Sequence, residues 1–399
     1  MYLAEKGMFW SACTLENKPV PNQDWITHKI DQWSLEDPEE NKRFLKSQKK
    51  HLQAVDLARQ DADLIATTGL DSKGERHYRI SDQVSDTPSG DHSVYQANDT
   101  FIELRTPFDE KRGLITMTML SALAGVVGVA LPGVLLDMIP DMITGVHSAT
   151  STPLGIDGYL AYGFISISTL TFITAFFYYG HPIIRLEAFV QRRILVRFNR
   201  QNRTVYVHRP AYAGGILALP WDKVIVGIKP DDSEASGMGL PLALGWGAEH
   251  SPNGVTNLLL VGRLARGNSE ISHLWEYIRR YMESDPAQPN PLPPPKRVGK
   301  FPWPWRSVMA ALSLVWPIFR IGSLYWMIPL LLLISPAVLL FATGHWISLW
   351  LCWEPRWPRF IRAACNDGLI DTLKPWLIDI GTWAMGAAAV YAAARYLSA

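Results

Sequence analysis

LITMTMLSALAGVVGVALPGVLLDMI, residues 114–139, and YLAYGFISISTLTFITAFFYY, residues 159–179, decide the fold class of this chain. Each stretch can cross a bilayer as a helix, because about 20 apolar residues span roughly 30 Å of hydrocarbon. Only a short segment separates the two stretches, so together they predict a transmembrane helical hairpin over residues 114–179. No charged residue or histidine lies in the middle of either stretch, which argues for an anchor and against a channel or transporter.

Charges on either side of the hairpin predict its orientation. The loop over residues 137–157 carries Asp137, Asp141 and Asp157 but no Lys or Arg. An arginine-rich segment follows the second stretch directly, and such segments stay in the cytoplasm. We therefore expect a multi-pass protein of the bacterial inner membrane whose N-terminus and main soluble domain are cytoplasmic. The arginines of this segment are Arg185, Arg192, Arg193, Arg197, Arg200, Arg203 and Arg209.

Composition outside the apolar stretches is that of a water-soluble chain, with a formal net charge of +1 over 399 residues. Cys13, Cys352 and Cys365 lie far apart in the sequence and indicate neither a disulfide framework nor a zinc site. Glu5 and Lys6 interrupt an apolar run that is too short for a cleaved signal peptide. The first span is therefore expected to act as the insertion signal.

The N-terminal region, residues 1–113, is acidic, with 20 acidic and 15 basic side chains. A helix is predicted over residues 37–66, with Asp37 as its N-cap and apolar residues at three- and four-residue steps from Leu52 onward. This helix either packs on its own domain or binds a partner. Residues 100–105 alternate between apolar and polar side chains, which predicts a short strand just ahead of the membrane.

The soluble module is predicted over residues 185–284. Residues 193–200 alternate, a short turn follows, and residues 204–208 alternate again, which is typical of a β-hairpin. The module ends with an amphipathic helix over residues 270–283. This order resembles a pleckstrin-homology-like (PH-like) antiparallel β-barrel, in which the apolar face of the C-terminal helix is core. Further strands are expected at residues 216–219, 223–228, 242–246 and 256–262.

Residues 285–305 form a proline-rich linker, predicted to be an extended spacer that leads back to the bilayer. Residues 306–353 are expected to form apolar membrane or interfacial helices, and residues 354–399 a basic segment with a C-terminal helix. The basic segment favours the cytoplasm, so residues 306–353 would cross an even number of times. The number of C-terminal crossings is left open. The expected fold class is thus an α+β membrane protein: a transmembrane hairpin, a PH-like barrel with a C-terminal helix, and C-terminal membrane or interfacial helices.

Motifs that carry chemistry are absent from the sequence. There is no zinc-helix histidine pair, Cys-x-x-Cys, Walker loop, dinucleotide fingerprint or nucleophile elbow. We therefore predict no catalytic, cofactor-binding or metal-binding residues, and a protein that is not an enzyme. The membrane tether and the strand context of the arginines argue against nucleic acid as a partner. The predicted contacts to a membrane surface or a partner are Arg185, Arg192, Arg193, Arg197, Arg200, Arg203, Trp303 and Trp305.

A resemblance to a known family rests on three strand segments and one later motif. These are residues 193–200, Val205-Tyr-Val-His208, Pro220-Trp221-Asp222, and Cys352-Trp-Glu-Pro-Arg-Trp-Pro358. Over residues 100–370 the chain resembles an uncharacterised family of proteobacterial inner-membrane proteins encoded near type VI secretion spike and effector genes. The resemblance implies an immunity or accessory protein for a secreted effector, with that effector or a secretion component as its protein partner.

Two further functions stay open beside the one that the resemblance implies. The first is a membrane-tethered PH-like module that binds lipid or scaffolds an envelope complex. The second is a component of a channel or transporter. The small residues Gly125, Gly128 and Gly133 of the first span allow a second helix to approach closely. That helix is the other arm of the hairpin or a second copy of the chain, so a homo-oligomer also stays open.

Overall fold

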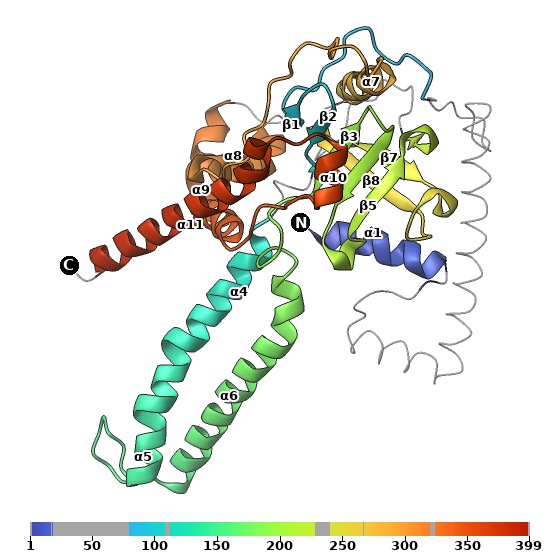
Figure 1. The fold of residues 1–399 in the computed structure, drawn as a ribbon. Helices are drawn as coiled ribbons and strands as arrows, with labels where there is room; N and C mark the ends of the chain where they lie inside the picture. Colours follow the sequence, from blue (N-terminus) through green and yellow to red (C-terminus); the bar gives the residue numbers. More distant parts are fainter. Residues whose placement is uncertain are drawn as a thin grey trace, which may run out of the picture. The chain divides into compact units, whose positions relative to one another are not determined.

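The computed structural model describes residues 2–16, 18, 80–107, 112–227, 240–265, 267–319 and 324–397. The helix predicted over residues 37–66 lies outside them. The chain forms two compact units (Figure 1). Unit 1 consists of Met1–Lys111, Gln191–Phe301 and Glu354–Ala399, and unit 2 consists of Arg112–Val190 and Pro302–Trp353. Unit 2 is therefore made of two insertions into the sequence of unit 1.

An antiparallel five-stranded sheet in the order β1-β2-β3-β4-β5 forms the centre of unit 1. β2 precedes the helical hairpin and pairs with β3 beyond it, Phe101 lying opposite Asn199. The strand expected at residues 100–105 and the β-hairpin within the arginine-rich segment are thus confirmed, but they belong to one sheet. The sheet of the module predicted to begin at residue 185 begins at Val94. The strands are β1 (Val94–Ala97), β2 (Phe101–Leu104), β3 (Leu195–Asn199), β4 (Thr204–His208) and β5 (Ile216–Pro220).

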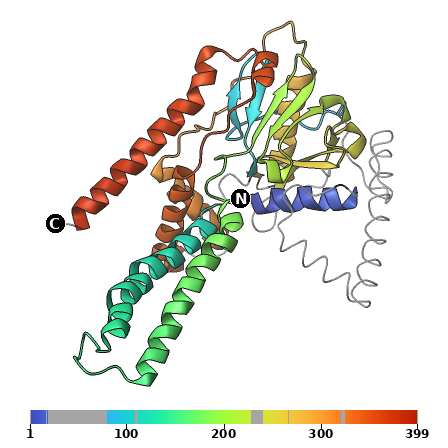
Figure 2. The same cartoon turned by 60° about the horizontal axis from the view of Figure 1, so that its bottom comes forward.

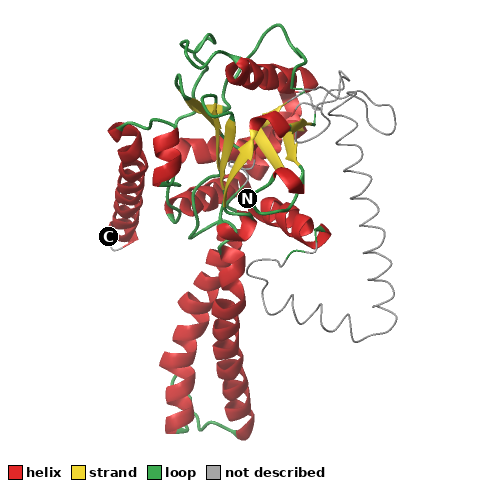
Figure 3. Ribbon diagram, turned by 45° about the vertical axis from the view of Figure 1, so that its right-hand side comes forward, coloured by secondary structure: helices red, strands yellow, loops and turns green. Residues whose placement is uncertain are grey.

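A second antiparallel sheet contains the remaining three strands, in the order β6-β7-β8. The predicted C-terminal helix of the module is α7 (Asn268–Glu283). The α+β class with antiparallel sheets is confirmed, whereas the strands of the described residues form two sheets and no closed barrel (Figure 3). The other elements of unit 1 are α1 (Tyr2–Leu15), η4 (Ala211–Ala213), η5 (Trp221–Lys223), β6 (Ile225–Val226), β7 (Leu240–Trp246), η6 (Ala248–His250), β8 (Asn257–Ala265), α10 (Arg359–Ala364) and α11 (Leu369–Leu397).

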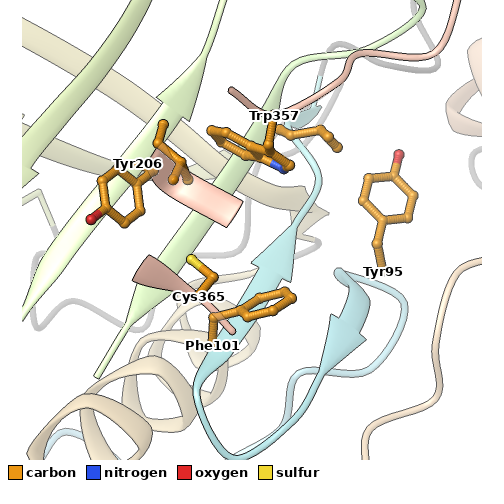
Figure 4. Packing of buried hydrophobic residues seen from close by; sticks show 7 residues of the cluster. Tyr95, Phe101, Tyr206, Trp357 and Cys365 are labelled. Carbon is orange, nitrogen blue, oxygen red and sulfur yellow. The ribbon is translucent and has the colours of Figure 1, made fainter. Parts of the chain in front are cut away.

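Both faces of the five-stranded sheet are covered, which is why every residue of β3 is buried. On one face Phe198 lies edge-on to Trp221, which stacks on Trp275 of α7 with ring centroids 5.4 Å apart. On the other face the segment that contains α10 packs on the strands. The apolar cluster of this second face consists of Tyr95, Phe101, Leu195, Tyr206, Trp357, Ile361 and Cys365 (Figure 4).

Unit 2 contains the predicted hairpin. Its first arm is continuous from Leu114 to Thr144, with two π-helical stretches on either side of Pro132, which supplies no N–H to the helix ladder. The second arm, α6 (Ile156–Ile184), lies beside the first (Figure 2). The first arm comprises α4 (Leu114–Gly125), η2 (Val126–Ala130), η3 (Gly133–Met138) and α5 (Ile139–Thr144), and the C-terminal helices of unit 2 are α8 (Pro304–Phe319) and α9 (Leu324–Trp350).

Four helical stretches of the described residues are long and apolar enough to span a membrane. Two of them, Leu114–Thr144 and Ile156–Gly180, are the arms of the hairpin. Leu332–Trp350 lies in α9 of unit 2, and Leu369–Tyr396 lies in α11 of unit 1. These stretches agree with the predicted membrane protein, and they place candidate spans in both units.

Candidate functional site

A buried carboxylate lies at the centre of the polar contacts on the α10 face of the sheet. Glu103 of β2 is fully buried and accepts hydrogen bonds from Arg197 Nε at 2.7 Å and from Trp357 Nε1 at 2.8 Å. It also pairs with the Lys300 ammonium. Burial raises the pKa of Glu103, but the Lys300 and Arg197 charges outweigh this effect, so its pKa lies well below the usual range. Glu103 is therefore ionised across the neutral pH range.

Arg197 connects this carboxylate to the segment beyond α10. Its Nη1 donates to both carboxylate oxygens of Asp367, at 2.8 and 3.0 Å. The guanidinium carbon also lies 4.1 Å from the centroid of the Phe101 ring and 4.9 Å from that of Trp357. Ion pairs and aromatic contacts therefore hold residues 357–367 against β2 and β3.

A second buried cluster attaches the start of α11 to the same sheet. Arg192 Nη1 lies 3.3 Å from Glu354 Oε2 and 3.3 Å from Asp379 Oδ1, and these three side chains have no exposed surface. Asp379 also pairs with Arg356 at 2.9 Å, and the Arg356 guanidinium lies 3.5 Å from the centroid of the Trp376 ring. Buried charges of this kind are tolerated only when they are paired, so the first turns of α11 are part of unit 1.

A cleft of about 620 Å³ opens between these two clusters, entirely within unit 1. Its walls come from β1 and β3, from the end of the proline-rich linker, and from the segment that runs through α10 into α11. The apolar part of the wall includes Tyr95, Trp357 and Trp376. The basic lining residues are Arg197, Arg297, Lys300, Arg356, Arg362 and Lys374, and the acidic ones are Asp367 and Asp371.

Cations outnumber carboxylates around this cleft even when the buried partners are included. Among the described residues, the lining residues and the buried groups linked to them by ion pairs, directly or through one another, comprise eight Arg or Lys and five Asp or Glu side chains. A concave, partly apolar wall with a surplus of three positive charges favours an anionic ligand, because low-dielectric walls strengthen the field inside a cleft.

Two of the lining arginines pair with no carboxylate of the described residues. Arg297 Nη2 donates to the Ala97 carbonyl at 3.1 Å. Arg362 Nη1 donates to Thr372 Oγ1 at 3.0 Å, while its Nε is buried and has no hydrogen-bond partner in the described part of the chain. A buried donor without an acceptor costs about 1–3 kcal/mol, so an acceptor atom of a ligand would be stabilised at Arg362.

The structure corrects the predicted surface role of four arginines. Arg192, Arg193, Arg197 and Arg200 are 0–7% exposed, and their side chains bond within unit 1. The physical reason is that residues 354–379 pack over Arg192, Arg193 and Arg197 and pair with them. Arg200 is enclosed elsewhere, at the end of β3, by the Asp99 and Gln288 carbonyls and the Ser284 hydroxyl. Arg203 stays partly exposed, paired with Asp222 and Glu283.

The other three predicted contacts remain accessible but belong to unit 2. Arg185 is exposed after α6, and Trp303 and Trp305 are 57% and 67% exposed at the start of α8. The eight predicted residues are therefore divided between the two units. Within the predicted linker, residues 285–303 contain no helix or strand and turn at residues 286–288, and α8 begins at Pro304. Part of the linker is fixed to unit 1, because the Val298 amide donates to the Val94 carbonyl at 2.8 Å.

Sequence reasoning interpreted the basic residues of the cleft as membrane-orienting charges. Arg356, Arg362 and Lys374 follow a hydrophobic block and match the general pattern of cytoplasmic flanks. The sequence feature that could have identified these residues as part of a site is their alternation with aromatic residues, as in Trp-Glu-Pro-Arg-Trp over residues 353–357. Among the described residues, no group of three or more His, Cys, Asp or Glu side chains could hold a metal ion.

Comparison with known proteins gives one match. The model of a family of unknown function (DUF6708) matches residues 173–368. The matched region begins within α6 and ends just before α11, so it contains most of the residues that line the cleft. No curated protein and no solved structure matches the chain.

Proposed function

We propose that this protein is a membrane-anchored, non-enzymatic binding protein that takes an anionic ligand in the cleft of unit 1. The observation that carries the proposal is the surplus of positive charge in a cleft of about 620 Å³, including the unsatisfied Nε of Arg362. Of the functions considered from the sequence, this one is closest to the membrane-tethered ligand-binding module. The antiparallel strands followed by α7 support a PH-like module with an open barrel in this role.

Native mass spectrometry of the full-length protein, extracted from membranes in detergent, tests this function. The wild-type protein is expected to retain a bound anion that is released when Arg362 is replaced by glutamine. An Arg263→Gln variant is the matched control, because Arg263 pairs with Glu270 away from the cleft. Equal retention of the same ligand by Arg362→Gln and wild-type protein would show that the cleft is not the binding site.

The proposed topology places the two sheets of unit 1 in the cytoplasm and the loop between α5 and α6 outside the inner membrane. Both insertions that make unit 2 start and end at unit 1, where Lys300 pairs with Glu103 and Glu354 pairs with Arg192. A folded sheet occupies one side of a membrane, so each insertion crosses an even number of times. α9 therefore does not cross alone: it crosses together with α8 or not at all.

This parity leads to a prediction about reporter fusions. Alkaline phosphatase, active outside the cytoplasm, and green fluorescent protein, fluorescent inside it, are fused after Phe301, after Trp353 and within the loop after Ala149. Fusions at Phe301 and Trp353 are expected to report the cytoplasm, and the fusion at Ala149 the opposite side. Opposite results at Phe301 and Trp353 would mean that α9 crosses alone. α8, with 16 residues and about 24 Å in length, would need local thinning of the bilayer to cross with it.

The resemblance supports a second candidate function, as immunity or accessory protein for a type VI secretion effector. The match to the family of unknown function, residues 173–368, lies within the stretch that carries this resemblance. Its test is co-expression with the toxin encoded beside the gene. An immunity protein rescues growth, and cells that die as fast with the protein as without it would exclude immunity.

A further inference from the structure

The cleft lies at the start of a candidate membrane span. Lys374, Pro375, Trp376 and Ile378 of α11 line it, and the span begins at Leu369. Ion pairs of Asp379 with Arg192 and Arg356, within the same unit, hold the first turns of this helix in place. A site that is joined in this way to the first turns of a membrane helix lies at the level of lipid head groups.

The surface of α11 next to the cleft is apolar and exposed. Leu369 and Ile370 are 75% and 72% exposed, and Leu377 is 66% exposed. Trp376 presents half of its surface and also contacts the Arg356 guanidinium, an arrangement typical of aromatic residues at a membrane interface. A ligand with a charged head in the cleft could therefore place hydrocarbon against the first turns of α11.

The cations of the cleft match phosphate chemistry. Arginine presents planar, forked donors that bind phosphate oxygens in pairs, and lysine adds a point charge. Arg297 and Arg362 have no carboxylate partner among the described residues, so a phosphate would not have to displace one. The exposed Lys374 pairs with Asp371 on the surface, where such pairs contribute little.

We propose that the cleft binds the phosphate group of an anionic phospholipid from the leaflet that faces unit 1. This inference rests on the proposed function and names the class of its ligand. The head group lies among Arg297, Lys300, Arg362 and Lys374, and the acyl chains lie along the exposed apolar side of α11. Membrane phospholipid is favoured over soluble phosphate because the cleft and the apolar surface of the candidate span are continuous along α11.

Isothermal titration calorimetry of the full-length protein in detergent tests the inference. The probes are dihexanoyl phosphatidylglycerol, dihexanoyl phosphatidylcholine, glycerol 3-phosphate and citrate. Wild-type protein is expected to bind phosphatidylglycerol most tightly. The double variant Arg297→Gln/Arg362→Gln should bind it at least about tenfold more weakly, since two charge-assisted hydrogen-bonding groups are removed. Arg362→Lys keeps the charge but loses the forked donors of the guanidinium. Its affinity for phosphatidylglycerol should lie between those of the wild type and the double variant.

A matched control carries the same change of charge outside the cleft. Lys223→Gln/Arg263→Gln removes one exposed lysine of η5 and one half-exposed arginine of β8, and it is expected to bind phosphatidylglycerol like the wild type. The single variant Arg297→Gln keeps the test valid if the double variant does not fold, because Arg297 is exposed and donates to the Ala97 backbone carbonyl, not to a buried side chain.

The remaining outcomes separate this inference from the proposed function. If glycerol 3-phosphate binds as tightly as phosphatidylglycerol, the site binds a soluble phosphate ester, and the proposal that its ligand is a phospholipid is wrong. If citrate is the one probe that binds, and the double variant does not bind it, the proposal of a phosphate ligand is wrong but the proposed anion-binding function stands. If the double variant and the wild type bind every probe equally, both the inference and the proposed function are wrong.

Discussion

Replacing Arg197 by methionine is expected to lower the free energy of unfolding of unit 1 by about 3–5 kcal/mol, because removing one member of a buried ion-pair network leaves charges without compensation. Arg197 is 4% exposed and bonds to Glu103 and Asp367. Glu103 keeps Lys300 and Trp357 as partners. Asp367 has no other ion pair with a described residue, so most of the penalty falls there.

Cys365 provides a local readout for this variant. Its thiol is fully buried on the same face of the sheet, within hydrogen-bonding distance of Asn199. Pulsed alkylation in increasing urea, with the modified peptide identified by mass spectrometry, measures how readily unit 1 opens. The Arg197→Met protein is expected to expose Cys365 at a lower urea concentration than the wild type.

Arg203→Met is the matched control for Arg197→Met. Arg203 follows β3 and carries the same charge, but its side chain is 40% exposed, and its pairs with Asp222 and Glu283 lie at the surface. Exposed pairs contribute at most about 1 kcal/mol, so the urea midpoint for Cys365 should change little. If both variants shift it equally, the network on the α10 face does not stabilise unit 1 in the way described.

Gly113→Ala is expected to destabilise unit 2 by about 2–5 kcal/mol, from backbone strain and steric overlap together. Gly113 has a φ of +111°, a conformation that L residues with side chains rarely adopt. A Cβ atom there would also overlap the backbone N and Cα of His345 in α9, the Cα at 2.5 Å. Backbone atoms cannot rotate away, so α4 and α9 would have to separate.

Alkylation of Cys352 in the same experiment measures how readily unit 2 opens in the Gly113→Ala variant. Cys352 is fully buried in unit 2, and its sulfur lies 2.9 Å from Arg112 Nη2 and 3.2 Å from the Glu187 carbonyl. Gly113→Ala should expose Cys352 at lower urea. The control is Gly125→Ala, because Gly125 has a helical φ of −62° and a Cβ there would meet nothing within 4 Å. Equal behaviour of the two glycine variants would contradict the close contact between α4 and α9.

The elements that sequence patterns predicted well are those with local signals. The hairpin arms, the β3–β4 pair and α7 follow from runs of apolar residues or from a period of 2 or 3.6, which short-range chemistry specifies. The predicted PH-like barrel is not confirmed, because the described strands form two sheets. The order of strands along a chain does not determine whether sheet edges meet. The module boundary was wrong because β2 pairs with β3 across the whole inserted hairpin, a contact that no local pattern contains.

For the candidate site, too, local patterns predicted the strand, whereas contacts between distant segments decided which residues come together. Alternation along residues 193–200 predicted β3, but it could not say which segment covers Leu195, Arg197 and Asn199. Residues 354–367 form that segment. Because they pack over the sheet, arginines that were expected at the surface are buried and paired with Glu103 and Glu354. Distant residues such as Arg297 and Arg362 come together only through this packing.

The sequence by itself determined which segments are long and apolar enough to span a membrane, where the first of them lies, and which segments form most of the strands, because hydrophobic length and periodicity are properties of neighbouring residues. Only the tertiary structure decided which arginines are buried in ion pairs and which line a cleft. Burial of a charge depends on whether a carboxylate from a distant segment lies within a few ångströms of it. The seven arginines that follow the hairpin therefore set its predicted orientation by their position alone, while several of them stabilise unit 1 through partners brought to them by the fold.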